Sequence, residues 1–424
     1  MLFFWPTIDK RQLLPWLHGQ PDVNFLVHIY RADNGFRRQL VVRQSLIFFM
    51  FSTMLAGQSF AADPGISDTE IRLGMVNAQS GAAAGLGQGM RIGAMAVFND
   101  VNTNGGIHGR QINLLVDDDA YDPDKAIDAT LKMIDQENVF SLFGYVGTPT
   151  ANAVLPIIKD TKIPLVGIFS GAMLLRKPVI PEVINLRASY GDETEILVDH
   201  FIKDRGAKRF AVFYQDDGFG LSVLAGTEMA LKRRGIEIVA KATFQRGTTA
   251  IQAGLATLIE SKPDVVIMVG PYTPLSTFIK NARTEGLKAS LATVSFVGTD
   301  NLVRLVGTDG DGVVISQVVP FPQNHDLPLA RECAALINKY APGEKLGFVN
   351  FEGCISAKAM VIALDRTGPA LTRPGLIHAF ESIKGLDIGG LQFNLGPDNH
   401  QASNSVFLTR ISQGKITSID TIPK

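Results

Sequence analysis

The sequence is poor in the residues that build metal clusters and disulfide scaffolds. Its 424 residues include 2 cysteines and 7 histidines, and no histidines have the H-E-x-x-H spacing of a helical zinc site. The formal net charge is −1, so no excess of positive charge would attract nucleic acid or an anionic membrane surface. We therefore expect no metal site, no resident cofactor and no nucleic-acid partner.

Catalytic motifs are missing as well. The stretch "GYVGTPT" (144–150) follows an apolar run, but it lacks the serine of a G-x-S-x-G nucleophile elbow. Neither Cys333 nor Cys354 falls in a loop that is expected to face a ligand. The sequence therefore favours a binding protein over an enzyme.

The apolar run near the N-terminus is too short to span a membrane. Residues 45–55, "SLIFFMFSTML", are about half the ~20 residues that a spanning helix needs. Arg37, Arg38 and Arg43 precede this run, and a small-x-small site ending at Ala61 follows it. This pattern predicts a signal peptide over 37–61, cleaved after Ala61, and hence a periplasmic protein. Residues 1–36 are interpreted as an over-extended start.

Export to an oxidising compartment leaves two states open for the cysteines. Cys333 and Cys354 both lie in predicted C-terminal helices. They form either one disulfide bridge or two buried thiols, because free cysteine is often simply buried.

From residue 70 onward, short apolar runs alternate with helical patterns. "IRLGMVNA" (71–78) reads as a strand, for example, and the following segment 86–102 has apolar residues at helical spacing. Near-continuous apolar strands between helices are typical of parallel sheets that are covered on both faces. The alternation of strand and helix patterns begins again after residue 187, so we predict two doubly wound α/β lobes. C-terminal helices and a final β-hairpin follow them.

In open α/β sheets, ligands bind outside the carboxyl ends of the strands. This rule selects six loops: 78–89, 145–150, 168–173, 215–220, 270–274 and 293–299.

The loops of the first lobe offer hydroxyls and small residues. Gly85 and Gly87 match two glycines of a dinucleotide fingerprint, but Met90 occupies the third position, so a tight turn beside a ligand is preferred. Thr148 either caps the next helix or, with the free N–H groups of that helix, binds an anion. A second loop has the same combination of a hydroxyl and small residues, in Ser170, Gly171 and Ala172. Two such loops favour a site over two unrelated caps.

The loops of the second lobe carry aromatic and acidic residues. Phe219 and Tyr272 are expected to close over a ligand as aromatic walls, unless they are ordinary half-exposed packing. Asp216 and Asp217 either bind a cation or cap the next helix, and capping is preferred.

One stretch resembles a known family. "FNDVNTNGGIHGRQINLLVDDDAYDP" (Phe98–Pro123) is similar to the signature of periplasmic binding proteins of the branched-chain amino-acid type, the solute receptors of ABC importers. The resemblance extends from about residue 70 to 419. It implies a monomer whose two lobes are joined by three crossings of the chain. The first lobe is expected to comprise residues 62–187 and 321–388. The second lobe is expected to comprise residues 188–320 and 389–424. It also implies a small-molecule ligand and the transmembrane subunits of an ABC permease as partners.

The resemblance assigns roles to individual residues. It places Thr148 at the ligand carboxylate, the backbone of 170–172 around carboxylate and ammonium, and Phe219 and Tyr272 as aromatic contacts. Ser295 takes the position of an acidic residue that meets the ligand ammonium in amino-acid receptors. Gly85 stands near a position where an aromatic residue is expected.

These two departures widen the range of ligands. A buried ammonium without a carboxylate partner is costly, so Ser295 puts the ammonium site in doubt. Glu193, which follows a hinge strand expected at Tyr190, is a candidate replacement. Branched-chain or other amino acids, organic or aromatic acids, and amides all stay open as ligands. A soluble periplasmic sensor that signals to a membrane receptor is the rival function.

Overall fold

The computed structural model describes residues 63–423. The predicted leader over 37–61, its cleavage after Ala61 and the extension over 1–36 lie outside these residues. Among the residues described, no helix combines the length and the apolar character that crossing a bilayer requires.

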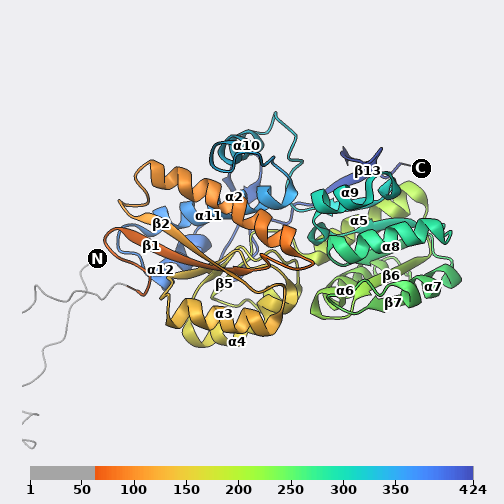
Figure 1. Cartoon of the computed structure of the whole chain (residues 1–424), viewed down its shortest axis with the longest axis horizontal. Helices are drawn as coiled ribbons and strands as arrows, with labels where there is room; N and C mark the ends of the chain where they lie inside the picture. The colour runs from red at the N-terminus through yellow and green to blue at the C-terminus, as the bar shows by residue number, and fades with distance from the viewer. Residues whose placement is uncertain (1–62, 424) are drawn as a thin grey trace, which may run out of the picture. The chain divides into compact units, whose positions relative to one another are not determined.

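Two sheets organise the described chain, as the predicted pair of doubly wound α/β lobes requires (Figure 1). We call the part around the five-stranded sheet the first lobe and the part around the seven-stranded sheet the second lobe.

The first sheet is entirely parallel, with the strand order β2-β1-β3-β4-β5. Its strands are β1 Glu70–Asn77, β2 Gln111–Asp118, β3 Ser141–Phe143, β4 Leu165–Val166 and β5 Val183–Ile184. Both faces of this sheet are covered, since the neighbouring side chains of Leu142 and Phe143 lie in separate hydrophobic clusters.

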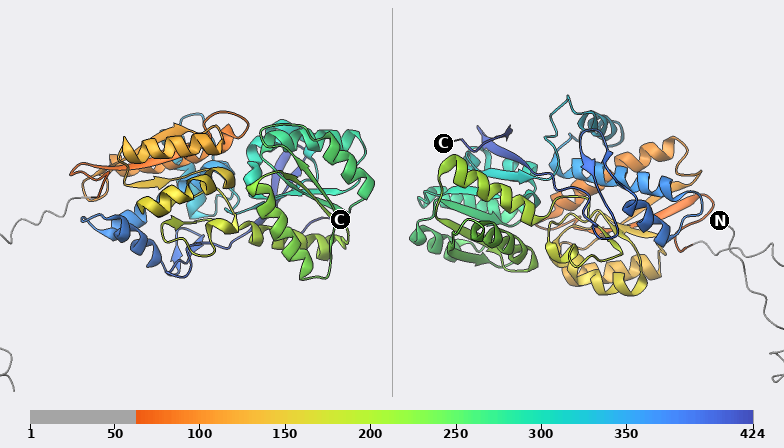
Figure 2. Two further views of the ribbon diagram at one scale, coloured as in Figure 1. Left: turned by 90° about the horizontal axis from the view of Figure 1, so that it is seen from below. Right: turned by 180° about the vertical axis from the view of Figure 1, so that it is seen from behind.

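Helices from both ends of the chain cover the first sheet. They are α2 Ala84–Thr103, α3 Pro123–Asp135, α4 Thr148–Thr161, α10 Pro328–Tyr340, α11 Phe348–Thr367 and α12 Arg373–Glu381. Helices α2, α10, α11 and α12 lie over one face, and α3 and α4 over the other (Figures 1 and 2). The C-terminal helices therefore return to the first lobe, as the resemblance implies.

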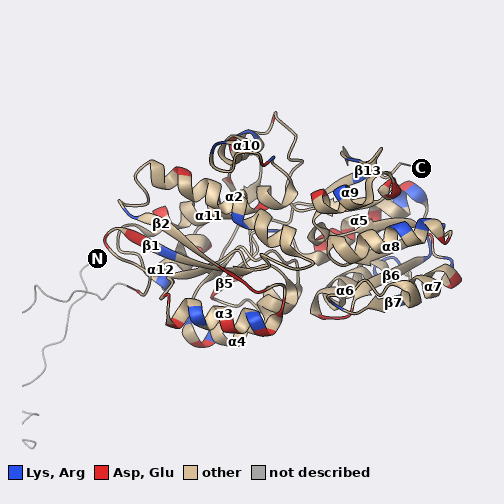
Figure 3. Cartoon of the chain, in the orientation of Figure 1, with Lys and Arg blue, Asp and Glu red and all other residues tan. Residues whose placement is uncertain are grey.

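Helix α3 illustrates how local sequence sets these elements. The side chain of Asp122 accepts hydrogen bonds from the N–H groups of Asp124 and Lys125, and Pro123 occupies the first turn. Ala126 and Met133 face the core, whereas the charged residues lie on the outer side of the helix (Figure 3). The amphipathic pattern thus fixes which side of α3 meets the sheet.

The second sheet has the order β14-β13-β10-β9-β8-β6-β7; β13 pairs antiparallel with both β10 and β14, and the other pairs are parallel. Its strands are β6 Phe210–Gln215, β7 Ile238–Phe244, β8 Val265–Val269, β9 Ser290–Thr293, β10 Val314–Gln317, β13 Phe407–Ser412 and β14 Lys415–Ile419. Its helices are α5 Tyr190–Arg205, α6 Gly218–Lys232, α7 Gln252–Ser261, α8 Tyr272–Thr284 and α9 Thr299–Val306. Short elements complete the chain: β11 Leu386–Asp387, β12 Gln392–Phe393, and the 3-10 turns η2 Met173–Leu175, η3 Ser295–Val297 and η4 Gly307–Gly310.

The chain passes between the sheets three times: after β5, after β10 and before β13. Asn185, just after β5, pairs with Gln401, and its carbonyl accepts the N–H of Ala402 at 2.8 Å. The last crossing therefore follows Gln401, later than the expected position near residue 388. The loop before β13 stays beside the first sheet because this pairing satisfies its backbone. The other lobe boundaries stay predictions.

Cys333 of α10 and Cys354 of α11 form a disulfide bridge, with a sequence separation of 21. Of the two alternatives, a disulfide bridge or two buried thiols, the structure shows the bridge. It fastens α10 to α11 over the first sheet.

Candidate ligand-binding site

The first feature of the site is a pair of hydroxyls at the start of α4. The helix is capped by Gly147 with no side-chain hydrogen bond, so of the two roles left open for Thr148 the capping role is not the one observed. The Oγ1 of Thr148 instead lies 2.8 Å from the Oγ of Ser170, and both residues are fully buried. Gly147 has φ 109°, and a Cβ there would lie 2.3 Å from the ring of Tyr121. Two loops of the first lobe thus bring their hydroxyls together beside a helix N-terminus, where an anion is favoured.

The loop that contains Ser170 is held by a buried arginine that the sequence analysis missed. Arg176 donates to the carbonyl oxygens of Ser170 and Ala172, each at 3.0 Å, and to that of Arg187 at 3.3 Å. Burial lowers the pKa of Arg176 to about 9, with the neighbouring charge of Arg187 contributing. The guanidinium thus fixes the loop and adds positive charge behind it.

Gly171 and Tyr190 meet directly. The N–H of Tyr190 donates to the carbonyl of Gly171 at 2.7 Å, and a Cβ on Gly171 would lie 2.5 Å from the tyrosine ring. Tyr190 was expected in a hinge strand, but it is the first residue of α5. The reason is a capping box, in which Ser189 and Asp192 exchange hydrogen bonds and start a helix at this point.

Five aromatic rings form a cluster between the lobes, which we call the aromatic cluster: Tyr121, Phe169, Tyr190, Phe219 and Phe296. The ring centroid of Phe296 lies 4.4 Å from that of Phe219, 5.5 Å from that of Phe169 and 6.0 Å from that of Tyr121. Tyr190 and Phe219 are 5.3 Å apart. Phe219 is fully buried in this cluster beside Phe296, which the sequence analysis missed, and its role as an aromatic wall stays a prediction.

Tyr272 contacts the first lobe through its hydroxyl group. Its hydroxyl accepts the N–H of Gly85, across the lobes, at 2.9 Å. Two further hydrogen bonds cross between the lobes nearby: Thr273 Oγ1 to the carbonyl of Ala82 at 3.2 Å, and Arg246 Nη1 to the carbonyl of Tyr121 at 2.9 Å. These contacts join the rims of the two lobes.

A cavity of about 340 Å³ lies beside these rim contacts. It is lined by loops that follow β1 and β2 in the first lobe and β6, β7 and β8 in the second, including Ala83, Tyr121, Gln215 and Arg246. Of the loops that the strand-end rule named, 78–89, 215–220 and 270–274 contribute to this lining, whereas the loops after β2 and β7 were not among those named. Asp217 caps α6 by accepting from the N–H groups of Phe219 and Gly220, as preferred over cation binding.

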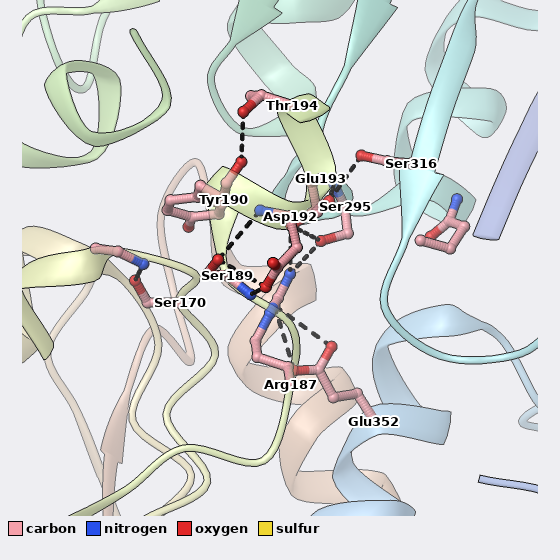
Figure 4. A network of polar contacts seen from close by, with 12 residues as sticks. Ser170, Arg187, Ser189, Tyr190, Asp192, Glu193, Thr194, Ser295, Ser316 and Glu352 are labelled. Carbon is pink, nitrogen blue, oxygen red and sulfur yellow. Dashed lines mark hydrogen bonds and ion pairs between the residues drawn. The ribbon is translucent and has the colours of Figure 1, made fainter. Parts of the chain in front are cut away.

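Ser295 belongs to a buried polar network (Figure 4). Its N–H donates to Glu193 Oε2 at 2.8 Å, and its Oγ donates to Glu193 Oε1 at 3.0 Å. Arg187 lies between this pair and Glu352, with its Nη2 3.4 Å from Glu193 and its Nη1 3.2 Å from Glu352. Glu193, expected as a free charge for a ligand ammonium, is thus already paired with Arg187.

Burial and charge act in opposition within this network. Burial raises the pKa of Glu193 and raises that of Glu352 to about 7, while Arg187 opposes both shifts. Burial alone would lower the pKa of Arg187, but Glu352 and Glu193 raise it above its ordinary value. Arg187 therefore stays charged. No group of three or more histidine, cysteine or acidic residues with metal-site geometry occurs within residues 63–423.

Comparison with known proteins agrees with this architecture. A family model described as "Periplasmic binding protein" matches residues 70–415. An amino acid binding protein of Pseudomonas aeruginosa is 22% identical over 238 residues, which cover 56% of this chain and 64% of that protein, just under two thirds of its length. A Leu/Ile/Val-binding protein of Citrobacter freundii is 22% identical over 287 residues, 67% of this chain and 74% of that protein.

A crystal structure of a possible leucine/isoleucine/valine-binding protein from Rhodopirellula baltica SH 1 superposes with a TM-score of 0.80. It is 35% identical to this chain and covers 83% of it, and 96% of that structure is matched. The two-lobed fold, the rim contacts between its lobes and these matches lead to one assignment: the chain belongs to the periplasmic binding protein family.

Proposed function

We propose that this protein is an extracytoplasmic solute-binding receptor of an ABC importer. In this proposal it works in the periplasm as a monomer, hands its ligand to the transmembrane subunits of a permease and catalyses no reaction. Its ligand is small, bears a carboxylate and binds between the two lobes.

The observation that supports this most directly is the hydroxyl pair of Thr148 and Ser170. The pair is buried, lies at a helix N-terminus and has the Arg176 guanidinium behind its loop. Helix N-termini and charged donors stabilise carboxylates, whose hydrogen bonds to them are stronger than neutral ones. The anionic end of the ligand therefore docks on the first lobe.

Closure of the second lobe then encloses the body of the ligand. Phe219 and Phe296 come from the second lobe, and the ring of Phe296 meets Tyr121 and Phe169 of the first, so closure removes apolar ligand surface from water. The hydrogen bond between Gly85 and Tyr272 joins the rims in the closed form.

The ligands named for proteins with the same fold support a ligand that bears a carboxylate. A substrate-binding protein from Thermomonospora curvata (TM-score 0.77, 22% identity) is named for fatty acid. One from Thermus thermophilus (TM-score 0.75, 17% identity) was solved with valine, and one from R. palustris (TM-score 0.73, 21% identity) with benzoate. All three kinds of ligand carry a carboxylate, although their bodies differ.

A thermal-shift screen tests the proposal. The purified chain is unfolded and refolded to remove carried-over ligand, then heated with L-amino acids, aliphatic and aromatic carboxylates, and short amides. A ligand at a hundredfold over its dissociation constant adds about 2.7 kcal/mol to the stability. A panel in which no carboxylate raises the melting temperature would refute the proposed ligand class.

Two matched variants test the hydroxyl pair. Thr148→Val removes a hydroxyl that faces Ser170, and we expect it to weaken carboxylate binding roughly 10- to 100-fold. Thr150→Val is the control, because the buried hydroxyl of Thr150 donates to the carbonyl of Val146, just before α4, at 2.6 Å and does not face Ser170. Equal affinities of the two variants would show that Thr148 does not bind the ligand.

A further inference from the structure

The buried network between the lobes bears on which carboxylates fit the cleft. Glu193 is one helical turn after Tyr190, whose N–H binds the loop of Ser170 through Gly171. Ser295, which Glu193 binds, directly precedes Phe296 of the aromatic cluster. Figure 4 shows Ser170, Tyr190, Glu193 and Ser295 in one view. Glu193 is thus a buried carboxylate that is linked to the loop of Ser170 through Tyr190 and to the aromatic cluster through Ser295.

The oxygens of Glu193 are already occupied. Its Oε2 accepts from the N–H of Ser295 at 2.8 Å and from the Oγ of Ser316 at 2.7 Å. Its Oε1 accepts from the Oγ of Ser295 at 3.0 Å and lies 3.4 Å from the Nη2 of Arg187. The side chain is fully buried. No charge is left over on Glu193 for a cationic group of a ligand.

Arg187 supplies the cation that this carboxylate needs. Its side chain is 2% exposed, and its guanidinium carbon lies 4.6 Å from the ring centroid of Phe169 in the aromatic cluster. Arg187 contacts residues of both lobes, since Glu352 lies on α11 and Ser295 follows β9. The protein therefore carries its own buried cation at the inner edge of the cleft.

Other carboxylates near the cleft are also engaged or poorly suited to a cation. Asp192 accepts from Ser189 and from Gln401, and Asp217 from the N-terminus of α6 and from Gln215. Asp119 accepts from the N–H of Tyr121 through one oxygen, while its buried second oxygen has no hydrogen-bond partner among the described residues. Asp119 is therefore a rival to Glu193 as a seat for an ammonium.

We infer that the ligand is a carboxylate without an α-ammonium, with an aromatic or branched apolar body, and that Arg187 holds the charge position that an ammonium would need. This inference rests on the proposed function and narrows its ligand class. The hydroxyl pair binds the carboxylate, the aromatic cluster receives the body, and an added ammonium finds Glu193 already neutralised.

Calorimetric titration with matched pairs tests the inference on the refolded chain. The pairs are 3-phenylpropanoate with L-phenylalanine and 4-methylpentanoate with L-leucine, whose members differ in the α-ammonium alone. We expect at least one acid to bind, and its amino acid to bind roughly a hundredfold more weakly or not at all, because its ammonium is buried unpaired.

Two outcomes overturn the inference. Amino acids that bind as tightly as the matched acids would contradict it while leaving the proposed receptor function intact, and loss of that binding in Asp119→Asn would identify the overlooked ammonium seat. Binding of neither member of either pair contradicts it as well. If every carboxylate of the wider screen also fails, the proposed function falls with it.

Variants provide a second test. Arg187→Met frees Glu193, so the preference for the acid over its amino acid should narrow at least roughly tenfold. Glu193→Gln should leave the affinity for the acid within a few-fold of wild type, with melting temperature and circular dichroism as checks on folding. If Arg187→Met does not fold, Glu193→Gln and the matched pairs still decide. A large loss of acid binding in folded Glu193→Gln contradicts the inference.

Discussion

Adding one methyl group at Gly85 should separate lobe closure from lobe stability. Gly85 lies in the first turn of α2, and a Cβ there would lie 2.5 Å from the Nδ2 of Asn301, on α9 of the second lobe. This collision exists only while the lobes are closed on each other. Gly85→Ala should therefore disfavour the closed form without damaging either lobe.

The substitution has two effects of opposite sign: it stabilises the helix α2 and it destabilises the closed form. Within α2, alanine favours the helix over glycine by up to about 1 kcal/mol. In the closed form, Asn301 must turn away and give up its 2.7 Å hydrogen bond with Arg304. The bond from the Gly85 N–H to Tyr272 is strained as well. Each bond contributes about 1 kcal/mol, so affinity should fall roughly 5- to 30-fold.

A matched control lies one turn further along the same helix. A Cβ on Gly89 would lie 2.7 Å from the Cγ1 of Val349 on α11, within the first lobe. Gly89→Ala should therefore destabilise the lobe by about 1–3 kcal/mol through overpacking and leave affinity unchanged.

Two measurements on each variant decide the matter: thermal denaturation without ligand, and calorimetric titration with the tightest-binding carboxylate of the screen. Wild-type affinity in Gly85→Ala, or equal losses of affinity in both variants, would show that the lobes do not meet at Gly85 in the bound form.

Two further predictions concern stability. Replacing both Cys333 and Cys354 by alanine opens a loop with a sequence separation of 21 and should lower the free energy of unfolding by about 3 kcal/mol in urea titrations, an effect that unchanged stability would contradict. Burial raises the pKa of Glu352 from its ordinary value of 4.5 to about 7, so the folded protein binds more protons than the unfolded chain and loses stability as pH rises through this window. Glu352→Gln should reduce the difference in unfolding free energy between about pH 5 and pH 8 by up to about 3 kcal/mol, whereas a pH dependence equal to that of wild type would refute the assignment.

Local patterns predicted most of the secondary structure, because the signals that start helices and bury strands lie within a few residues of one another. Asp122 and Pro123 predict the start of α3, and the all-apolar run of Val265–Val269 predicts a strand that is buried on both faces. The capping box at Ser189 was overlooked, so Tyr190 was placed in a strand although the signal was present in the sequence.

The site was predicted in part. The strand-end rule located the hydroxyls of Thr148 and Ser170 on neighbouring loops, and the structure brings them within 2.8 Å. Phe296 was missed because its run reads as a continuing strand, whereas β9 ends at Thr293 and a 3-10 turn carries the ring into the cleft.

The sequence by itself determined the class of fold and the order of most of its elements, since both follow from periodicity and short-range hydrogen bonding. Only the tertiary structure decided the charge balance of the cleft. Glu193 and Ser295 are 102 residues apart, and Arg187 and Glu352 are 165 apart. No local pattern tells which buried charges will pair, because residues this far apart in sequence are brought together only when the chain crosses between the two lobes.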